Sequence, residues 1–104
     1  MVVPMSISVR GDEHHVVVRV AGEIDMATAP TLAARIHGEQ PAPQGQLVID
    51  LSRVEFCDAS GLRVIVDANR RVSEIRGHLI LRSVPANVQK LLTATELANT
   101  FTLA

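Results

Sequence analysis

The chain has 104 residues, of which 47% are hydrophobic, so it carries enough apolar material for one compact domain with a single core. Its formal net charge is −1, and Phe56 and Phe101 are its only aromatic residues. This composition argues against a cationic surface for phosphates or anionic lipids and against aromatic platforms for bases or sugars, so we expect no nucleic acid partner and no membrane partner.

The first part of the chain has the pattern of a β-hairpin followed by a helix. Polar and apolar residues alternate over residues 6–10, and a second strand pattern covers residues 15–21 after the turn residues Gly11 and Asp12. A helix-like segment follows at about residues 28–37.

Strand and helix patterns alternate through the rest of the chain. Residues 47–51 and 79–82 are nearly continuous apolar runs, as in strands covered on both faces. Helix patterns cover residues 60–76 and 85–93, with Pro85 at the expected first helical position. This order predicts an α/β fold, a mixed β-sheet packed against α-helices, in a single domain over residues 1–104.

The helix pattern that begins at Ser60 has an apolar face and a charged face. A step of about 100° per residue turns six residues toward the sheet: Gly61, Val64, Ile65, Ala68, Val72 and Ile75. Leu62 and Val66 fall outside this direction and are candidates for contact with a partner. The alternative is that another part of the same domain covers them, or that they are isolated surface aliphatics.

Ser60 stands where a strand pattern passes through Asp58 into this helix, and such a serine can be a helix cap, a nucleophile or a phosphorylation site. A cap is the commonest role and contributes about 1 kcal/mol. A nucleophile elbow would need glycine at the positions of Asp58 and Leu62, and no histidine spacing brings a base to Ser60. We therefore do not expect an enzyme.

No metal site and no cofactor are expected. Cys57 is the only cysteine, and the adjacent His14 and His15 would point to opposite faces of a strand. Gly61 is the only glycine in the strand-to-helix turn, so a phosphate-cradling loop is absent. We expect Cys57 to be a small buried residue. With no disulfide, no secretory signal pattern and no apolar run near the ~20 residues of a membrane span, a cytoplasmic protein is expected.

Three segments resemble the STAS domain of bacterial anti-sigma factor antagonists, and together they extend over nearly the whole chain. They are residues 20–30, 47–72 and 88–101, and their most specific parts are Gly22-Glu23-Ile24-Asp25 and Asp58-Ala59-Ser60-Gly61-Leu62. The resemblance implies a small α/β domain. Members commonly have Thr-Gly-Leu where this chain has Thr95-Glu96-Leu97, so we expect the final helix to be capped differently.

The resemblance also implies a switch. In these antagonists the serine before the glycine, here Ser60, is phosphorylated by a partner that is both an anti-sigma factor and a serine kinase. The unphosphorylated form binds this partner and frees the sigma factor, phosphorylation abolishes binding, and a serine phosphatase restores it. The implied partner-binding surface around Ser60 consists of Asp25, Thr28, Asp58, Ala59, Gly61, Leu62 and Val66.

A STAS scaffold, or a transport-complex subunit that binds a protein partner without phosphorylation, is the alternative. We expect a monomer or a weak dimer.

Overall fold

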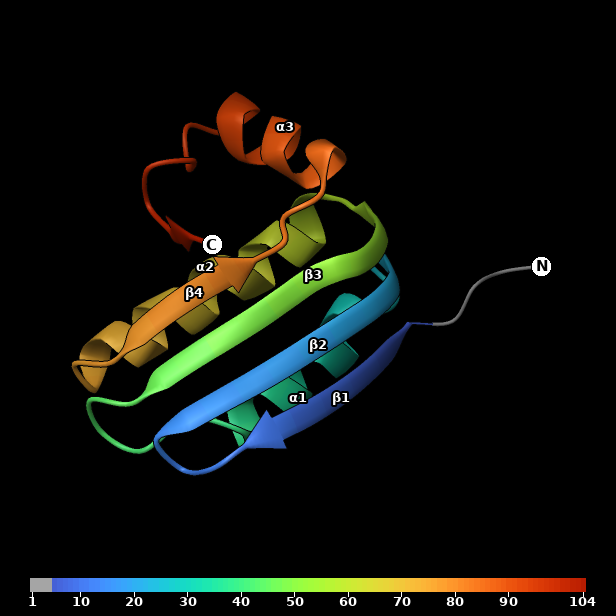
Figure 1. The fold of residues 1–104 in the computed structure, drawn as a ribbon. Coiled ribbons are helices and arrows are strands. Elements are labelled where there is room, and N and C mark those ends of the chain that lie inside the picture. Colours follow the sequence, from blue (N-terminus) through green and yellow to red (C-terminus); the bar gives the residue numbers. More distant parts are fainter. Residues whose placement is uncertain (1–4) are drawn as a thin grey trace.

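A computed structural model describes residues 5–104 and has one five-stranded sheet (Figure 1). The strands lie side by side in chain order: β1 (Ser6–Gly11), β2 (His15–Ile24), β3 (Gln46–Cys57), β4 (His78–Arg82) and β5 (Thr102–Leu103). β1 and β2 form the predicted antiparallel hairpin, and the other neighbouring strands are parallel. The mixed sheet confirms the predicted fold class.

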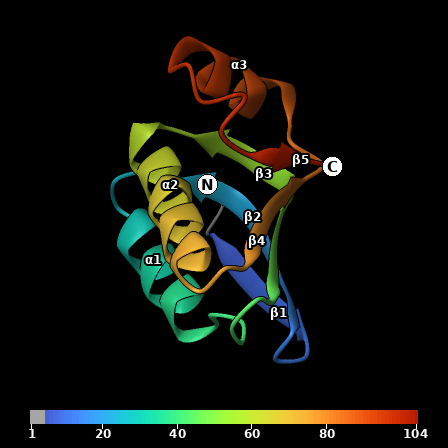
Figure 2. The ribbon, with the colours of Figure 1, turned by 90° about the vertical axis from the view of Figure 1, so that its left-hand side faces the viewer.

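Two of the three helices pack side by side on one face of the sheet (Figure 2). These are α1 (Ala29–Gly38) and α2 (Ala59–Glu74), and α3 (Ala86–Ala94) lies at one end of the sheet beside β3. Among the described residues, no helix covers the opposite face. Nor is any helix of residues 5–104 long and apolar enough to cross a membrane.

The core lies between the sheet and the two helices. Alternate residues of β2, among them Val18 and Val20, are fully buried on the helix side. All five residues of β3 from Leu47 to Leu51 are buried, although the open face has no helical cover. The sequence predicted cover on both faces. That is wrong for the open face, where β3 is buried by its central position and by side chains of the flanking strands.

Several boundaries differ from the predicted ones. β3 extends to Cys57, beyond the predicted end at residue 51. Its second half was not predicted because bulges relative to β2 disturb the alternation of inward and outward residues there. Gly22 adopts φ +95° between the two register shifts, a conformation that suits glycine. α3 begins after Pro85 instead of at it, and β5 was not predicted.

Candidate functional site

Ser60 lies where the carboxyl ends of β2 and β3 meet. The loop from β2 to α1 and the turn from β3 to α2 are tied together, because the Asp58 N–H donates to the carbonyl oxygen of Ile24 at 3.1 Å. Ser60 is the second residue of α2 and is half-buried. The fold therefore brings the two most specific sequence segments into contact.

The cap of α2 is Asp58. Its Oδ1 accepts hydrogen bonds from the N–H of Ser60 at 2.8 Å and from that of Gly61 at 3.3 Å. Of the roles that the sequence left open for Ser60, capping is excluded, since the helix begins one residue earlier than predicted and the carboxylate of Asp58 takes the free amides. Within residues 5–104, no hydrogen bond engages the Ser60 hydroxyl.

Gly61 lets the first turn of α2 lie close to the ends of the two strands. A Cβ on this residue would lie 2.6 Å from Ile24 Cγ2 and 2.7 Å from Cys57 Sγ, closer than van der Waals contact allows. Gly61 is buried. The structure thus gives it a packing role and leaves no accessible side of it for the predicted contact with a partner.

Asp25 and Thr28 hold the loop before α1. Asp25 Oδ1 accepts from the N–H of Ala27 at 2.9 Å and from that of Thr28 at 3.0 Å. In return, Thr28 Oγ1 accepts from the Asp25 N–H and donates to the carbonyl of Glu23, each at 2.9 Å. Their bonds fix the loop that carries the exposed side chain of Met26, and their contact with a partner stays a prediction.

Leu62 does not lie on the surface. It is only 4% exposed and belongs to the main core cluster, together with Val88, Leu92 and Phe101 from the C-terminal segment. Its predicted contact with a partner is therefore wrong for this conformation, because its own domain covers it. Val66 is exposed, as expected, and Ala59 is exposed beside Ser60.

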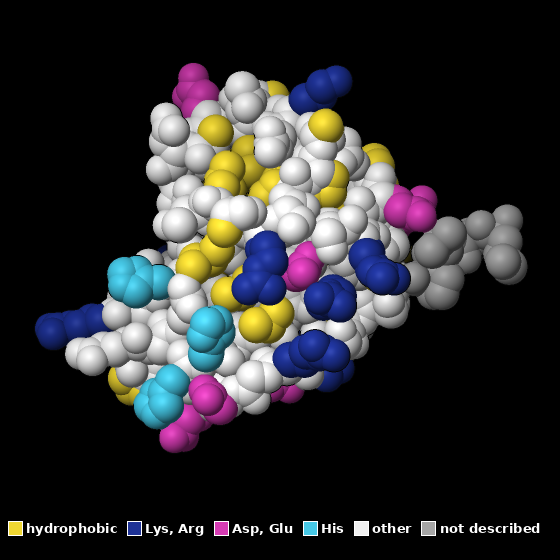
Figure 3. Space-filling view, viewed as in Figure 1, with side chains coloured by type: hydrophobic (Ala, Val, Ile, Leu, Met, Phe, Trp, Pro, Cys, Tyr) yellow, Lys and Arg dark blue, Asp and Glu magenta, His cyan; other side chains and the backbone are white. Residues whose placement is uncertain are grey.

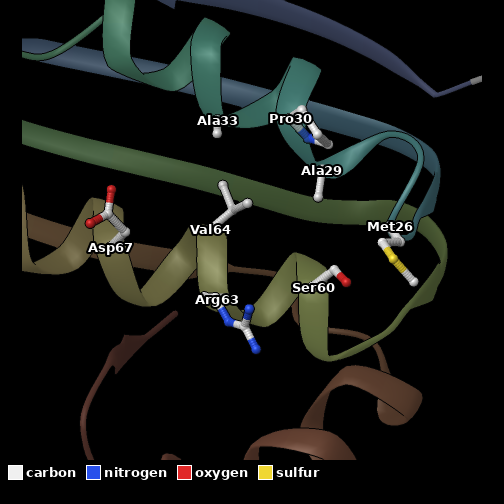
Figure 4. A pocket seen from close by; sticks show the side chains of 8 residues that line it. All are labelled: Met26, Ala29, Pro30, Ala33, Ser60, Arg63, Val64 and Asp67. Atoms are coloured by element: carbon white, nitrogen blue, oxygen red, sulfur yellow. The ribbon is translucent and has the colours of Figure 1, made fainter.

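A shallow groove of about 340 Å³ runs between α1 and α2, and Ser60 lies in it (Figure 4). Val64 points from α2 toward Ala29 and Ala33 of α1, and Ser60 lies at the end nearer Met26. The full lining is Met26, Ala29, Pro30, Ala33, Ser60, Arg63, Val64 and Asp67. A hydroxyl at the end of a mostly apolar groove is suited to contact with a protein.

Sequence reasoning missed two exposed apolar side chains, of which Met26 lines this groove. Met26 is 78% exposed and Phe56 is 47% exposed, and each stands within two residues of Asp25 or Asp58. The sequence could have indicated their exposure, because each is a large apolar residue close to a turn carboxylate, at a position that no strand or helix pattern required to be buried.

The STAS domain family model matches residues 6–104. The chain belongs to the STAS domain family. The anti-sigma-B factor antagonist of Listeria monocytogenes is 32% identical over 88 residues, which cover 85% of this chain and 77% of that protein.

Solved STAS structures have the same fold. The crystal structure of an anti-sigma factor antagonist from Mycobacterium paratuberculosis aligns with a TM-score of 0.83 and 31% identity, covering 99% of this chain and 89% of that one. The Bacillus protein SpoIIAA aligns at 20% identity with TM-scores of 0.78 for its unphosphorylated form and 0.71 for its phosphorylated form. These alignments cover 95% of this chain in both cases and 88% and 91% of the respective SpoIIAA chains.

The thiol of this STAS domain is shielded from reaction. Burial, followed by the negative charge of Asp58, raises the pKa of Cys57 to about 11. Its side chain is buried, as the sequence predicted. Because the thiolate is the nucleophilic form, the raised pKa disfavours reaction of Cys57. Its side chain instead packs against Gly61.

The acidic side chain in the lining of the groove, Asp67, is paired with arginines of α2 itself. Asp67 is bonded by Arg71 at 2.8 Å and by Arg70 at 2.6 Å, and these hydrogen bonds lower the pKa of its carboxyl group. Within residues 5–104, no group of three or more His, Cys, Asp or Glu side chains could hold a metal ion. The STAS site thus presents a hydroxyl, an apolar groove and the exposed guanidinium of Arg63.

Proposed function

We propose that this STAS domain is an anti-sigma factor antagonist switched at Ser60. The unphosphorylated form binds a cognate anti-sigma factor that is also a serine kinase, and so releases the sigma factor. Phosphorylation of Ser60 ends the binding. The observation that carries the proposal is the Ser60 hydroxyl, free of hydrogen bonds within residues 5–104 and placed at the end of the groove between α1 and α2. Relatives named as antagonists support it.

The position of Ser60 allows phosphorylation without refolding. A phosphoryl group adds about −1.5 to −2 charge, and in the second residue of α2 it would lie at the positive end of the helix dipole. That location contributes typically 0.3–1 kcal/mol at an exposed site. Asp58 remains free to cap the helix, because its bonds go to backbone amides. The similarity of the fold to both forms of SpoIIAA is consistent with a domain that tolerates the modification.

A bound partner would be affected more strongly than the domain. A protein surface packed over Met26 and the apolar groove would have to bury the dianion or move away from it. Each ~1.4 kcal/mol lost lowers the affinity tenfold. A serine phosphatase would reverse the change. Sigma factor control of this kind takes place in the cytoplasm, which is the location the sequence predicted.

The test is binding of the cognate anti-sigma factor to the wild-type protein, Ser60→Ala and Ser60→Asp. Wild type and Ser60→Ala should bind alike, and Ser60→Asp should bind at least about tenfold more weakly, a loss of ~1.4 kcal/mol. Ser73→Asp is the matched control, since Ser73 is exposed at the other end of the same helix. It should bind like wild type.

Incubation with the partner and ATP, followed by mass spectrometry, should place one phosphate on Ser60 and none on Ser60→Ala. Equal affinity of the wild type and both Ser60 variants would contradict the proposal. Binding without phosphate transfer would favour the scaffold or transport-complex alternative instead.

A further inference from the structure

The open face of the sheet, on the opposite side from α1 and α2, is basic. One arginine side chain from each of the first four strands projects from it, and we call this set the arginine face: Arg10, Arg19, Arg53 and Arg82. Figure 3 looks onto this face and shows dark blue side chains gathered over the middle of the strands. The overall charge of −1 therefore hides a strong local asymmetry.

Strand register sets the arrangement. Arg19, Asp50 and Arg82 form one row across β2, β3 and β4, with Asp50 in the centre. Arg10 pairs with Val17 and Arg53 with Ala21, which places these two arginines on the same face. Partners in register lie on one side of a sheet, so the four guanidinium groups share a single surface.

One buried carboxylate holds the centre of this surface. Asp50 is 4% exposed, and its Oδ2 lies 3.5 Å from Nε of Arg19. Because a single carboxylate faces four arginines, the arginine face has a net positive charge. Among residues 5–104, the nearest other acids in the chain lie toward its ends: Glu23 and Glu55 at the carboxyl ends of their strands, and Asp12 and Glu13 in the hairpin turn.

Apolar side chains lie beside the arginines. Val17, Val48 and Ile80 form the adjacent row across the same three strands. Val48 is 1% exposed, while Val17 and Ile80 are half-buried. This apolar row thus has Arg19 and Arg82 along one side and Arg10 at its β1 end, and a surface that combines apolar side chains with arginines has the composition of a protein interface, in which arginine is enriched.

We propose that the arginine face binds a second protein partner, through an acidic surface that presents carboxylates beside an apolar side chain. This partner is distinct from the one at Ser60, because α2 packs on the other face of the sheet. Charge complementarity favours such an occupant over a second copy of the chain, since a symmetric contact would set arginines against arginines. A protein partner is favoured over nucleic acid for two other reasons. Neither Phe56 nor Phe101 lies in these rows to stack on bases, and the net charge of the chain is negative.

The experiment is an NMR titration of isotope-labelled protein with a synthetic peptide of Glu, Asp and Leu. A second peptide, in which Lys replaces every Glu and Asp, is titrated for comparison. The acidic peptide should shift the backbone amide resonances of Arg19, Val48 and Arg82, and the basic peptide should not. Because Arg10 and Arg53 make none of the salt bridges found in the described residues, Arg10→Gln/Arg53→Gln should fold normally. This variant should bind the acidic peptide about five- to tenfold more weakly.

The matched control is Arg76→Gln/Lys90→Gln, which removes the same charge from exposed positions outside the arginine face that also make none of these salt bridges, and it should bind like wild type. Equal weakening of both double variants would overturn the proposal, and so would shifts confined to the Ser60 groove. Tighter binding of a DNA duplex than of the acidic peptide to these strands would also overturn it, in favour of nucleic acid. Anti-sigma factor binding at Ser60 should be unchanged in the arginine variant, so this proposal and the proposed function can fail separately.

Discussion

Asp58 Oδ1 accepts a hydrogen bond from the backbone N–H of Ser60 at 2.8 Å, so the cap of α2 and the hydroxyl at its start belong to two different residues. The carboxylate satisfies the free amides at the start of α2, so the serine hydroxyl is not needed as a cap and makes no hydrogen bond within residues 5–104. The same Asp58 donates its own N–H to Ile24, which fixes the helix start against the end of β2. A change at position 58 should therefore act on the stability of this helix start.

Asp58→Ala should lower the free energy of unfolding by about 0.5–2 kcal/mol, because the amides of Ser60 and Gly61 lose their acceptor. Asp58→Asn is the matched control, since an asparagine oxygen can cap the helix equally well. Denaturant unfolding of the three proteins at neutral pH measures the difference. An Asn variant as unstable as the Ala variant would show that charge, and not capping, holds the turn.

Gly61→Ala should be destabilising by about 1–3 kcal/mol, even though alanine is the better helix former. The added Cβ would lie 2.6 Å from Ile24 Cγ2 and 2.7 Å from Cys57 Sγ, and neither neighbour has space to withdraw in a packed core. Thermal unfolding would show the loss as a lower Tm.

Gly38→Ala provides the comparison for Gly61, because a Cβ at Gly38, the last residue of α1, would meet nothing within 4 Å. It should be neutral or slightly stabilising. If both alanine variants lost equal stability, close approach of α2 to the strands would not be the reason for glycine at position 61.

The sequence predicted the hairpin, the order of elements and the position of Ser60, since periodicity and turn residues are local signals. The burial of Leu62 could not be predicted in the same way. The buried residues of α2 include both Leu62 and Ile65, so its core face is shifted toward Leu62, while Val64 is only partly buried against the core and also lines the groove with α1. The C-terminal segment with Phe101 contributes to the core cluster that encloses Leu62, and only the tertiary fold shows that return.

Glu96→Gly should stabilise the domain by about 0.5–1 kcal/mol. α3 ends in a Schellman motif, in which the Leu97 N–H donates to Leu92 at 2.8 Å and the Glu96 N–H to Thr93 at 3.1 Å. Glu96 has φ +60° there, in the left-handed region that favours glycine. The helix end therefore has the geometry that glycine favours, so the prediction of a different cap is wrong, and Glu96→Gly removes the cost of the left-handed conformation.

Ala94→Gly is the control for Glu96→Gly, because Ala94 is the last helical residue of α3 and does not need a left-handed conformation. It should destabilise by about 0.5–1 kcal/mol. Denaturant midpoints of the two variants should move in opposite directions, and movement in the same direction would contradict the assigned strain at Glu96.

The stability of the domain should fall in acid partly through Asp50. Burial raises the pKa of this carboxyl group, but the hydrogen bonds from Ser52 and the charges of Arg19 and Arg82 outweigh it, so the pKa is lower than the ordinary 3.8. A lowered pKa in the folded state means that ionised Asp50 stabilises the fold above pH 3.8, and that this contribution is lost as the pH falls through the folded-state pKa. Asp50→Asn should therefore show a shallower loss of unfolding free energy between about pH 5 and pH 2 than wild type. An equal dependence of the unfolding free energy on pH in the two proteins would contradict this role of Asp50.

Met26→Ser should weaken binding of the anti-sigma factor without changing the stability of the domain. The Met26 side chain is 78% exposed, so the substitution removes little buried apolar surface from the folded domain. The side chain stands at the Ser60 end of the groove, where a partner would cover it. Loss of a buried anchor at an interface commonly costs more than 1 kcal/mol, or about a fivefold drop in affinity. Leu103→Ser is the control, since Leu103 is 43% exposed on β5 and does not line the groove. Calorimetric titration should show the drop for Met26→Ser alone, and equal affinities for the two variants would place the partner outside the groove.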